Sequence, residues 1–465
     1  MPRTITDQYL DRYQRIAADD GGTSLLPVTG AQRRFVLVRS LDPSGRPDLV
    51  PMFFAFPADT VDPVRLRRAA NRLAALHPVL RARPDVVRGT PVLRLAEPDV
   101  PVEQVVRAPG EDAAGALRRV LGAWEAQGSP LRLYLVQEGS ATGDEVLAVV
   151  LDHTACDGQS LARIVEELTA AYRDETESTG RGSTGPESTG REFAGPEPGE
   201  VAAELAAYRE AVHLQLDAER RAGSAGALAY WGDRLRAVHE RAPQLRPPTA
   251  VPGALPTGAA ELRLPAPASG VAFPALLDAC RAAARVLYGS GQVMPIGYPW
   301  GGRPPGAPPV LGCFLNTVVF PAATVDVPHA PDETATQWWD DLDRADTPFD
   351  AVVHAARLAG SPWSGRLDGL LTVDDARRRP ALRLGGVDGR EVHIGGRQVR
   401  APFAVSVTHG PELHLRMVWD RAVLDDDAAR DGFAAFRDAV RAPAPEPVTT
   451  PGPVTAAVPA SAPVG

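Results

Sequence analysis

The sequence predicts a mixed α/β fold, and three observations lead to this class. Strand-like and helix-like patterns alternate between residues 25 and 173, and they mix again between residues 260 and 440. A polar, repetitive segment at residues 174–200 separates these two stretches. The chain has 465 residues, of which 44% are hydrophobic, so it is long enough for two or three domains with a sizeable core.

The first stretch contains a well-marked helix and a pair of strands. Asp62 can cap a helix with its carboxylate, Pro63 suits the first helical position, and Pro78 follows the helix-like run VRLRRAANRLAAL. Residues 131–136 and 146–153 are predicted to be two strands, because a polar, glycine-containing loop joins two apolar runs. A second helix is predicted after them, with one apolar face formed by Leu161, Ile164, Val165, Leu168 and Tyr172.

Composition predicts where the domains begin and end. The segment 174–200 repeats ESTGR and GPE and has almost no apolar side chains, so we expect a flexible surface insertion. It divides an N-terminal lobe, residues 1–173, from a C-terminal lobe, residues 201–442. The proline-rich tail at residues 443–465 is expected to be disordered.

Charge and composition argue against several classes of function. The net charge of −9 argues against a nucleic-acid binder, and the lack of an apolar run of about 18 residues argues against a membrane protein. All 49 basic residues are arginine, which excludes a Schiff-base lysine for pyridoxal phosphate and a Walker phosphate loop. The N-terminus lacks the apolar core of a signal peptide. Three widely spaced cysteines, Cys156, Cys280 and Cys313, indicate a cytoplasmic setting and offer no metal framework.

The stretch most suggestive of chemistry is DHTACDG, at residues 152–158. His153 ends a predicted buried strand, and histidine is the usual residue for moving a proton during acyl transfer. Asp157 could orient it, hold the turn or cap the next helix, and Gly158 lets the chain pass closely without a side chain. Ser160 lacks a G-x-S-x-G context, so a serine nucleophile is not expected. These residues alone leave both a catalytic and a structural histidine open.

Six further segments accompany DHTACDG in order along the chain. They are LLPVTGAQRRF (25–35), LHPVLRAR (76–83), SPLRLYLV (129–136), ALAYWGDRL (227–235), IGYPWGGRPPGAPPVLGCFLNTVVF (296–320) and TPFDAVVHAARL (347–358). Over about residues 25–440, they resemble the motifs of nonribosomal peptide synthetase condensation domains, in the chloramphenicol-acetyltransferase-like superfamily. DHTACDG is similar to the HHxxxDG motif of that family, and the segment 296–320 to its GR and GxFxNT motifs.

This resemblance implies a fold and an activity. The fold would be two chloramphenicol-acetyltransferase-like α/β lobes in a V, with a central substrate tunnel between them. The activity would be acyltransferase chemistry in natural-product biosynthesis, antibiotic biosynthesis included. His153 would position the attacking group and take its proton, or stabilise the tetrahedral intermediate, as an amide or ester forms.

The same resemblance implies supporting roles for four residues. Asp157 would point away from the tunnel and pair with Arg303, which fits the need of a buried charge for a partner. Gly158 would keep the backbone close to the substrate, and Asn316 would support the tunnel wall on the second lobe.

Asp152 replaces the first histidine of the family motif and opens an alternative. DHTACDGQS also fits the DxxxxDxxS signature of heterocyclisation domains through Asp152, Asp157 and Ser160, which makes Asp152 and Ser160 candidate site neighbours. Those domains lack the histidine that this chain keeps as His153. Epimerisation domains and dihydrolipoyl acyltransferases share the motif in other contexts. A catalytically inactive domain that recruits carrier proteins is the alternative without chemistry, and the presence of His153 favours an enzyme.

The sequence contains one condensation-like unit, without a GGxS carrier segment or an adenylation module, so we expect a free-standing enzyme. Its expected partners are acyl or peptidyl carrier proteins, which supply the phosphopantetheine arm, and an amine or alcohol acceptor, free or carrier-bound. We expect no bound cofactor, no metal, no nucleic acid and no membrane.

Overall fold

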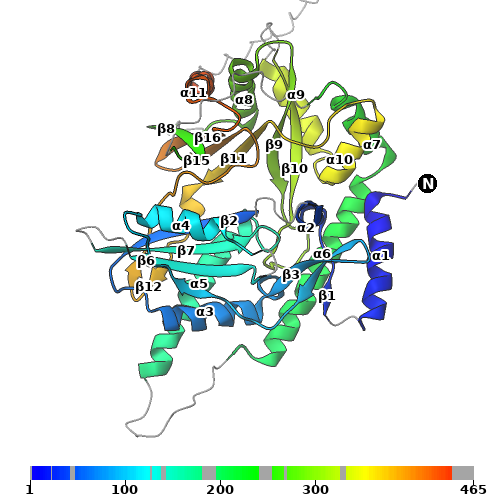
Figure 1. The fold of residues 1–465 in the computed structure, drawn as a ribbon. Coiled ribbons are helices and arrows are strands. Elements are labelled where there is room, and N and C mark those ends of the chain that lie inside the picture. Colours follow the sequence, from blue (N-terminus) through cyan, green and yellow to red (C-terminus); the bar gives the residue numbers. More distant parts are fainter. Residues whose placement is uncertain are drawn as a thin grey trace, which may run out of the picture.

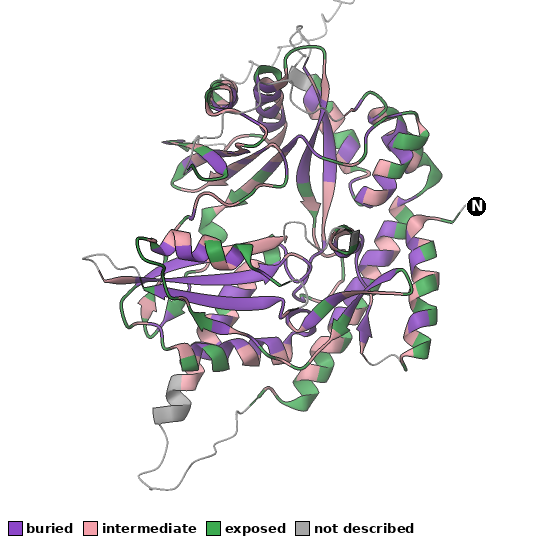
Figure 2. Ribbon diagram, in the orientation of Figure 1, coloured by how far each residue is buried: buried purple, intermediate pink, exposed green. Residues whose placement is uncertain are grey.

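Two α/β lobes lie one above the other in Figure 1, each built around its own β-sheet with helices packed against it. This arrangement confirms the predicted mixed α/β class. The central strands β6 (Leu131–Gln137) and β7 (Asp144–Asp152) of the lower sheet are buried along nearly their whole length (Figure 2). The computed structural model describes residues 3–21, 24–41, 48–125, 128–137, 143–180, 195–239, 254–266, 270–324 and 331–441.

The lower lobe contains a five-stranded sheet in the order β14-β2-β7-β6-β5. Its middle strand, β7, is antiparallel to both neighbours, and Asp152 at its end pairs with Leu49 at the start of β2. β6 and β7 are the two strands predicted at residues 131–136 and 146–153. The strands are β2 (Leu49–Pro57), β5 (Val102–Gln104), β6 (Leu131–Gln137), β7 (Asp144–Asp152) and β14 (Arg390–Glu391).

Helices cover both faces of this sheet. α3 (Pro63–Leu76) and α5 (Gly158–Gly180) pack on one face, and α4 (Ala113–Gly122) packs on the other. α3 begins where the sequence predicts, because the Asp62 carboxylate accepts a hydrogen bond from the backbone N–H of Val64 at 2.9 Å. The short turn from β7 to α5 carries the DHTACDG stretch.

The upper lobe contains a six-stranded sheet in the order β10-β9-β11-β15-β16-β8. α8 and α11 cover one face of it (Figure 1), and alternate residues of β16 from Leu413 to Trp419 are buried on that side. The residues between them, Arg416 among them, face the other way, toward the lower lobe. The elements are β8 (Thr257–Pro265), β9 (Val293–Gly301), β10 (Leu315–Ala323), β11 (Gly369–Asp375), β15 (Phe403–His409), β16 (Glu412–Asp420), α8 (Phe273–Tyr288) and α11 (Asp426–Arg441).

The other elements flank or join the lobes. β1 (Leu25–Leu26), β4 (Thr90–Leu95) and β3 (Ala82–Val87) form a small sheet beside the lower lobe, and β12 (Arg383–Leu384) pairs with β13 (Val387–Asp388). The remaining helices are α1 (Ile5–Asp19), α2 (Gly30–Leu41), α6 (Pro198–Ala222), α7 (Ala225–Arg234), α9 (Pro331–Leu342) and α10 (Phe349–Leu358).

The chain crosses between the lobes more often than a single boundary at residues 174–200 implies. β14 comes from late in the chain but adds a strand to the lower sheet, and the lower core also takes Tyr208 of α6 and Phe314 from before β10. The ends of α5 and α6 extend into the predicted insertion. Residues 181–194 and the predicted tail, 443–465, lie outside the described residues.

Candidate active site

His153 lies directly after β7, where the two lobes meet. Its backbone N–H donates to the Asp48 carbonyl at 2.9 Å, which continues the β2–β7 pairing past the strand end and fixes the position of the residue. Its half-buried ring places Nδ1 3.8 Å from Sγ of Cys313, which lies just before β10 of the upper lobe. The strand end of one lobe therefore presents this imidazole to the other lobe.

The ring of Phe35, on α2, stacks on His153, with centroids 4.6 Å apart and planes at 27°. The guanidinium of Arg400 lies 5.1 Å from the centroid of the same phenyl ring, and its Nε is 2.7 Å from Oδ1 of Asp48. Phe35 thus contacts both a cation and the imidazole, and this packing restricts the orientation of the His153 ring.

Burial and two nearby arginines lower the pKa of this histidine. The pKa of His153 is lowered to about 3, because burial disfavours the charged ring and Arg400 and Arg34 repel it. Arg34 lies 4.0 Å from the ring centroid of Phe349, and burial together with repulsion by Arg400 lowers its pKa to about 10. The imidazole is therefore neutral near neutral pH and can accept a hydrogen bond or a proton from a nucleophile. The neighbouring cations would favour negative charge that develops there.

Asp157 forms a buried ion pair with Arg303 from the segment between β9 and β10. The distance from Arg303 Nη1 to Asp157 Oδ2 is 2.9 Å. The carboxylate also accepts hydrogen bonds from the backbone N–H groups of Ser160 at 2.9 Å and Phe314 at 3.1 Å. The bond from Ser160 caps α5, so helix capping and charge pairing are both present. These contacts fasten the turn after β7 to the upper lobe's crossing segment.

Ser160 completes this network, and its hydroxyl is fully engaged. Its Oγ accepts hydrogen bonds from Arg303 Nη2 at 2.9 Å and from the Gly312 N–H at 3.1 Å, and lies 2.9 Å from the Gly312 carbonyl. Gly312 has a φ of +152°, and a Cβ there would lie 2.7 Å from the Phe314 ring. Only glycine fits where these two segments cross.

Asp152 forms a separate buried ion pair with Arg39 of α2. Arg39 Nη2 lies 2.5 Å from Asp152 Oδ2, and Asp152 Oδ1 accepts from the backbone N–H and the hydroxyl of Thr154 at 2.9 and 2.6 Å. Asp157 and Ser160 are paired as well. All three residues of the heterocyclisation signature therefore have their polar atoms bound within the protein.

Asn316 and Gly158 occupy different parts of the site. Nδ2 of Asn316 donates to the carbonyls of Ala345 at 2.7 Å and Thr347 at 2.6 Å, which links β10 to the turn before α10. Gly158 is exposed, and no neighbouring atom lies within 4 Å of the position that a Cβ would take. The space beside Gly158 is therefore open.

The sequence analysis did not identify Phe35, Arg34, Arg400 or Cys313 as site residues. Phe35 and Arg34 lie in the segment 25–35, which was noted only as a family motif. Arg400 lies in an irregular stretch before β15 and carries no local signal. Burial raises the pKa of the Cys313 thiol, so it remains protonated beside the histidine.

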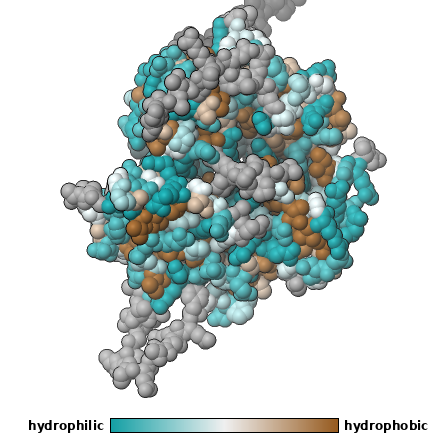
Figure 3. All heavy atoms as spheres, in the orientation of Figure 1, coloured by the Kyte–Doolittle hydropathy of each residue, from teal (hydrophilic) through white to brown (hydrophobic). Residues whose placement is uncertain are grey.

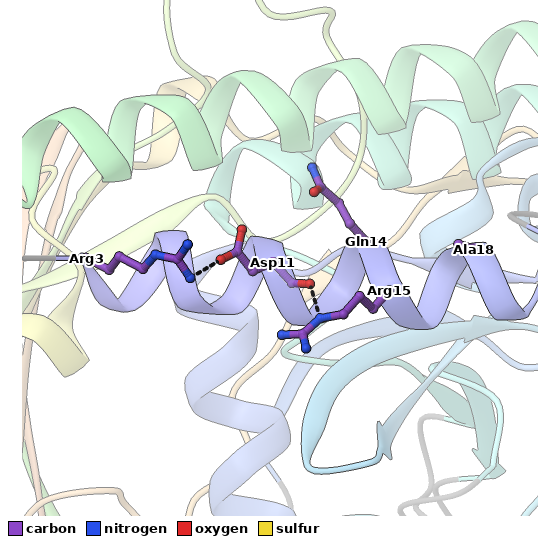
Figure 4. Close-up of a pocket in the computed structure, with 5 residues that line it drawn as sticks. All are labelled: Arg3, Asp11, Gln14, Arg15 and Ala18. Atoms are coloured by element: carbon purple, nitrogen blue, oxygen red, sulfur yellow. Dashed lines mark hydrogen bonds and ion pairs between the residues drawn. The ribbon is translucent and has the colours of Figure 1, made fainter.

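A hollow along α1, at the edge of the molecule, is a less suitable site for chemistry (Figure 4). Arg3 pairs with Asp11 at 2.6 Å, and Nε of Arg15 donates to the Asp11 carbonyl at 3.0 Å, so its charged groups pair with one another. In the described part of the chain, no three His, Cys, Asp or Glu side chains are placed to hold a metal ion. Within the same ranges, every helix is too short or too polar to cross a membrane.

The most informative sequence relatives are large synthetases. A Salinispora arenicola protein named as a nonribosomal peptide synthetase, CymA, is 27% identical over 426 residues, covering 87% of this chain and 5% of the relative. AMB antimetabolite synthetase AmbE of Pseudomonas aeruginosa is 27% identical over 468 residues, covering 95% of this chain and 20% of the relative. This chain thus spans only a small part of their length. No protein-family model matches the chain.

Solved structures of condensation-type domains share the fold. The starter condensation domain of rhizomide synthetase RzmA superposes with a TM-score of 0.64 at 16% identity, covering 91% of this chain and 95% of that one. The X-domain from teicoplanin biosynthesis gives 0.61 at 18% identity, covering 90% and 95%. The chain therefore has the fold of these domains, and both sequence relatives are named as synthetases.

Proposed function

We propose that this protein is a condensation enzyme that transfers an acyl or aminoacyl group from a carrier-protein thioester to an amine or hydroxyl acceptor. The observation that carries the proposal is the position of His153 at the junction of the lobes, with Nδ1 3.8 Å from Cys313 Sγ, in the segment that resembles the family's histidine motif. A solved neighbour, the rhizomide starter condensation domain, holds C8-CoA and Leu-SNAC, which supports a thioester-binding role for this fold.

His153 would act on the nucleophile. The acceptor nitrogen or oxygen attacks the thioester carbonyl carbon, and a C–N or C–O bond forms while the C–S bond breaks. Nδ1 of His153 lies toward Cys313, so Nε2 is the nitrogen available to accept the nucleophile's proton. That proton then passes to the departing thiolate. Because its low pKa makes it a weak base, we infer that the imidazole mainly orients the nucleophile by accepting its hydrogen bond.

The partners follow from this chemistry. A carrier protein would supply the phosphopantetheine arm, so the chain itself needs no dissociable cofactor for acyl transfer. The acceptor would reach His153 from the other side of the lobe junction, beside the open space at Gly158. No observation favours heterocyclisation, because Asp152, Asp157 and Ser160 are each paired within the protein.

The test is acyl transfer measured by intact-protein mass spectrometry. An acyl-loaded carrier protein is mixed with amines, alcohols and aminoacyl carriers, using the wild type, His153→Ala and His354→Ala. His354 is an exposed histidine of α10 and serves as the matched control. We expect transfer by the wild type and by His354→Ala, and a loss of about 100-fold in His153→Ala, on the order of the cost of misplacing a reacting group. Full-rate transfer by His153→Ala would overturn the role of this residue.

A further inference from the structure

A basic cluster made of His393, Arg397, His414 and Arg416 lies between the lobes, apart from His153. His393 and Arg397 precede β15, and His414 and Arg416 lie on the face of β16 that points toward the lower lobe. The Cζ of Arg397 is 5.5 Å from the ring centroid of Phe53 on β2. The cluster therefore has the upper sheet on one side and the lower sheet on the other.

The chain around Arg397 is held by both lobes. Arg118 of α4 donates Nη1 to the Gly395 carbonyl at 3.2 Å. A Cβ on Gly396 would lie 3.0 Å from Leu255, just before β8, and 3.2 Å from Arg118. Packing from two sides fixes the backbone that carries Arg397, so the position of this guanidinium group is well defined.

One exposed carboxylate, Glu261, forms long ion pairs with two members of the cluster, and no carboxylate of the described residues pairs with Arg397. Among the described residues, Arg397 makes no hydrogen bond or ion pair, and the buried Nε atoms of Arg397 and Arg416 have no acceptor. Glu261 is the nearest acid, 3.9 Å from Arg416 and 3.4 Å from His414, and its side chain is 61% exposed. Burial and repulsion by Arg416 lower the pKa of Arg397 to about 10.

Three other inward-facing arginines among the described residues have short ion pairs. Arg303 has Asp157, Arg39 has Asp152 and Arg234 has Asp341, each within about 3 Å. A guanidinium withdrawn from water without a counter-ion is unfavourable, and two that repel one another are more so. Two guanidinium groups placed together in this way do not help the protein to fold. A bound anion would offset both the burial of their charge and their mutual repulsion.

We propose that the basic cluster binds an anionic oxygen group, phosphate or carboxylate, of a substrate that lies between the lobes. Guanidinium groups suit both, because their N–H donors match two oxygens at once. Phe53 is four residues along β2 from Leu49, or about 13 Å from the strand end beside His153. The bound group is therefore remote from the reacting carbonyl and contributes to substrate binding and not to bond making. This inference rests on the proposed condensation activity for its substrate, but the anion site can be tested without that activity.

The first experiment measures anion binding to the full chain by isothermal titration calorimetry. The probes are inorganic phosphate and succinate, titrated at constant ionic strength into the wild type, Arg397→Gln, Arg416→Gln and Arg430→Gln. Arg430 is an exposed arginine of α11, on the far face of the upper sheet, and is the control. We expect at least one probe to bind the wild type and the control equally, and at least tenfold more weakly to the two cluster variants. No binding to the wild type, or unchanged binding to Arg397→Gln, would overturn the site.

The stability of the variants toward denaturant provides a second test of the anion site. Because Arg397 has no acidic partner, Arg397→Gln should unfold at the same or higher denaturant concentration than the wild type when no anion is present. A stabilisation by phosphate or succinate should be seen in the wild type and be absent in Arg397→Gln. A large destabilisation of Arg397→Gln without anion would show that this residue serves the fold and would overturn the proposal.

Transfer kinetics then identify the source of the anion. Suppose that Arg397→Gln raises KM for a carrier-bound donor but not for an N-acetylcysteamine thioester. The anion bound by the cluster would then be the phosphate of the pantetheine arm. A rise confined to acceptors with a free carboxylate, compared with their amides, would assign that carboxylate. If KM rises in neither comparison, the cluster does not bind a substrate. Absence of transfer by the wild type would count against the proposed function, while the calorimetry would still decide the anion site.

Discussion

Asp152 and Arg39 form a buried ion pair, with 2.5 Å between Oδ2 and Nη2, at the place where the family motif has its first histidine. The pair links the end of β7 to α2, the helix that also carries Phe35. A change from histidine to aspartate is thus matched by an arginine on the facing helix. The pair therefore holds the strand end that precedes His153.

Removing the cation of this pair should be costly. In Arg39→Gln the Asp152 carboxylate stays buried at 2% exposure with only Thr154 as a donor, and an unpaired buried charge typically costs roughly 3–5 kcal/mol. We expect the free energy of unfolding in urea to fall by about that much. The control is Arg72→Gln, whose ion pair with Asp174 is exposed and 3.5 Å long, and which should lose at most about 1 kcal/mol. Equal losses in both variants would contradict this assignment.

His153 should remain uncharged across the physiological pH range. Its pKa of about 3 depends on burial first and then on the charges of Arg400 and Arg34. Side-chain NMR of the wild type should therefore show no titration of this ring between pH 5 and 8. Arg400→Gln removes the charge that repels the ring more strongly and should move the pKa toward the ordinary value of a histidine. A His153 signal that titrates near pH 6.5 in the wild type would contradict the proposed neutral imidazole.

Because of His77, the free energy of unfolding should fall as the pH rises. Carboxylates with a lowered pKa have the opposite effect. Burial alone would lower its pKa, but hydrogen bonds to Glu167 at 2.5 Å and Glu204 at 2.8 Å raise it above the ordinary value. A raised histidine pKa contributes stability that is complete below about pH 6.5 and is lost as the pH rises through the folded-state pKa.

The measurement compares unfolding free energies of the wild type and His77→Gln from pH 6 to pH 9. The wild-type advantage should be largest at pH 6 and shrink toward pH 9. His213→Gln, which removes an exposed histidine of α6, should show no such trend. A difference that is constant with pH would mean that His77 is neutral in the folded protein.

Local patterns in the sequence predicted much of the fold. The helix capped by Asp62 and the two strands before His153 depend on short-range signals, namely a cap, a proline and apolar runs, and all three elements occur where expected. The edge strand β14 was not predicted, because two exposed residues carry no periodicity and their pairing with β2 is set by tertiary structure.

The candidate site was likewise predicted only in part. Asp157 and Arg303 are 146 residues apart, and no local pattern links them; only the resemblance to a family suggested their pairing. Arg400 and Arg397 lie in a segment without regular structure, and their importance depends on which charges surround them in the fold. Sequence reasoning therefore singled out His153 and the turn after it, but not the arginines that lie near this histidine.

Glu219 should change stability with pH in the same direction as His77, because the folded-state pKa of each group is raised. It is buried on α6, where one carboxylate oxygen accepts the Gly30 N–H at 2.8 Å and the other has no partner among the described residues. Burial outweighs the attraction of Arg33 and raises the pKa of Glu219 to about 7. An acid with a raised folded-state pKa keeps its proton longer when folded, so stability falls as the pH rises from about 4.5 to 7 and then levels off.

The neutral variant Glu219→Gln removes this titration and keeps an oxygen to accept the Gly30 N–H. A shift from 4.5 to about 7 corresponds to about 3 kcal/mol, so we expect Glu219→Gln to gain up to that much over the wild type at pH 8 and little at pH 4.5. Chemical denaturation across this pH range provides the measurement. Glu210→Gln, on an outward-facing position of the same helix, is the control and should follow the wild type. If Glu219→Gln is instead less stable at pH 8, the ionised carboxylate pairs with Arg33 strongly enough to outweigh its burial.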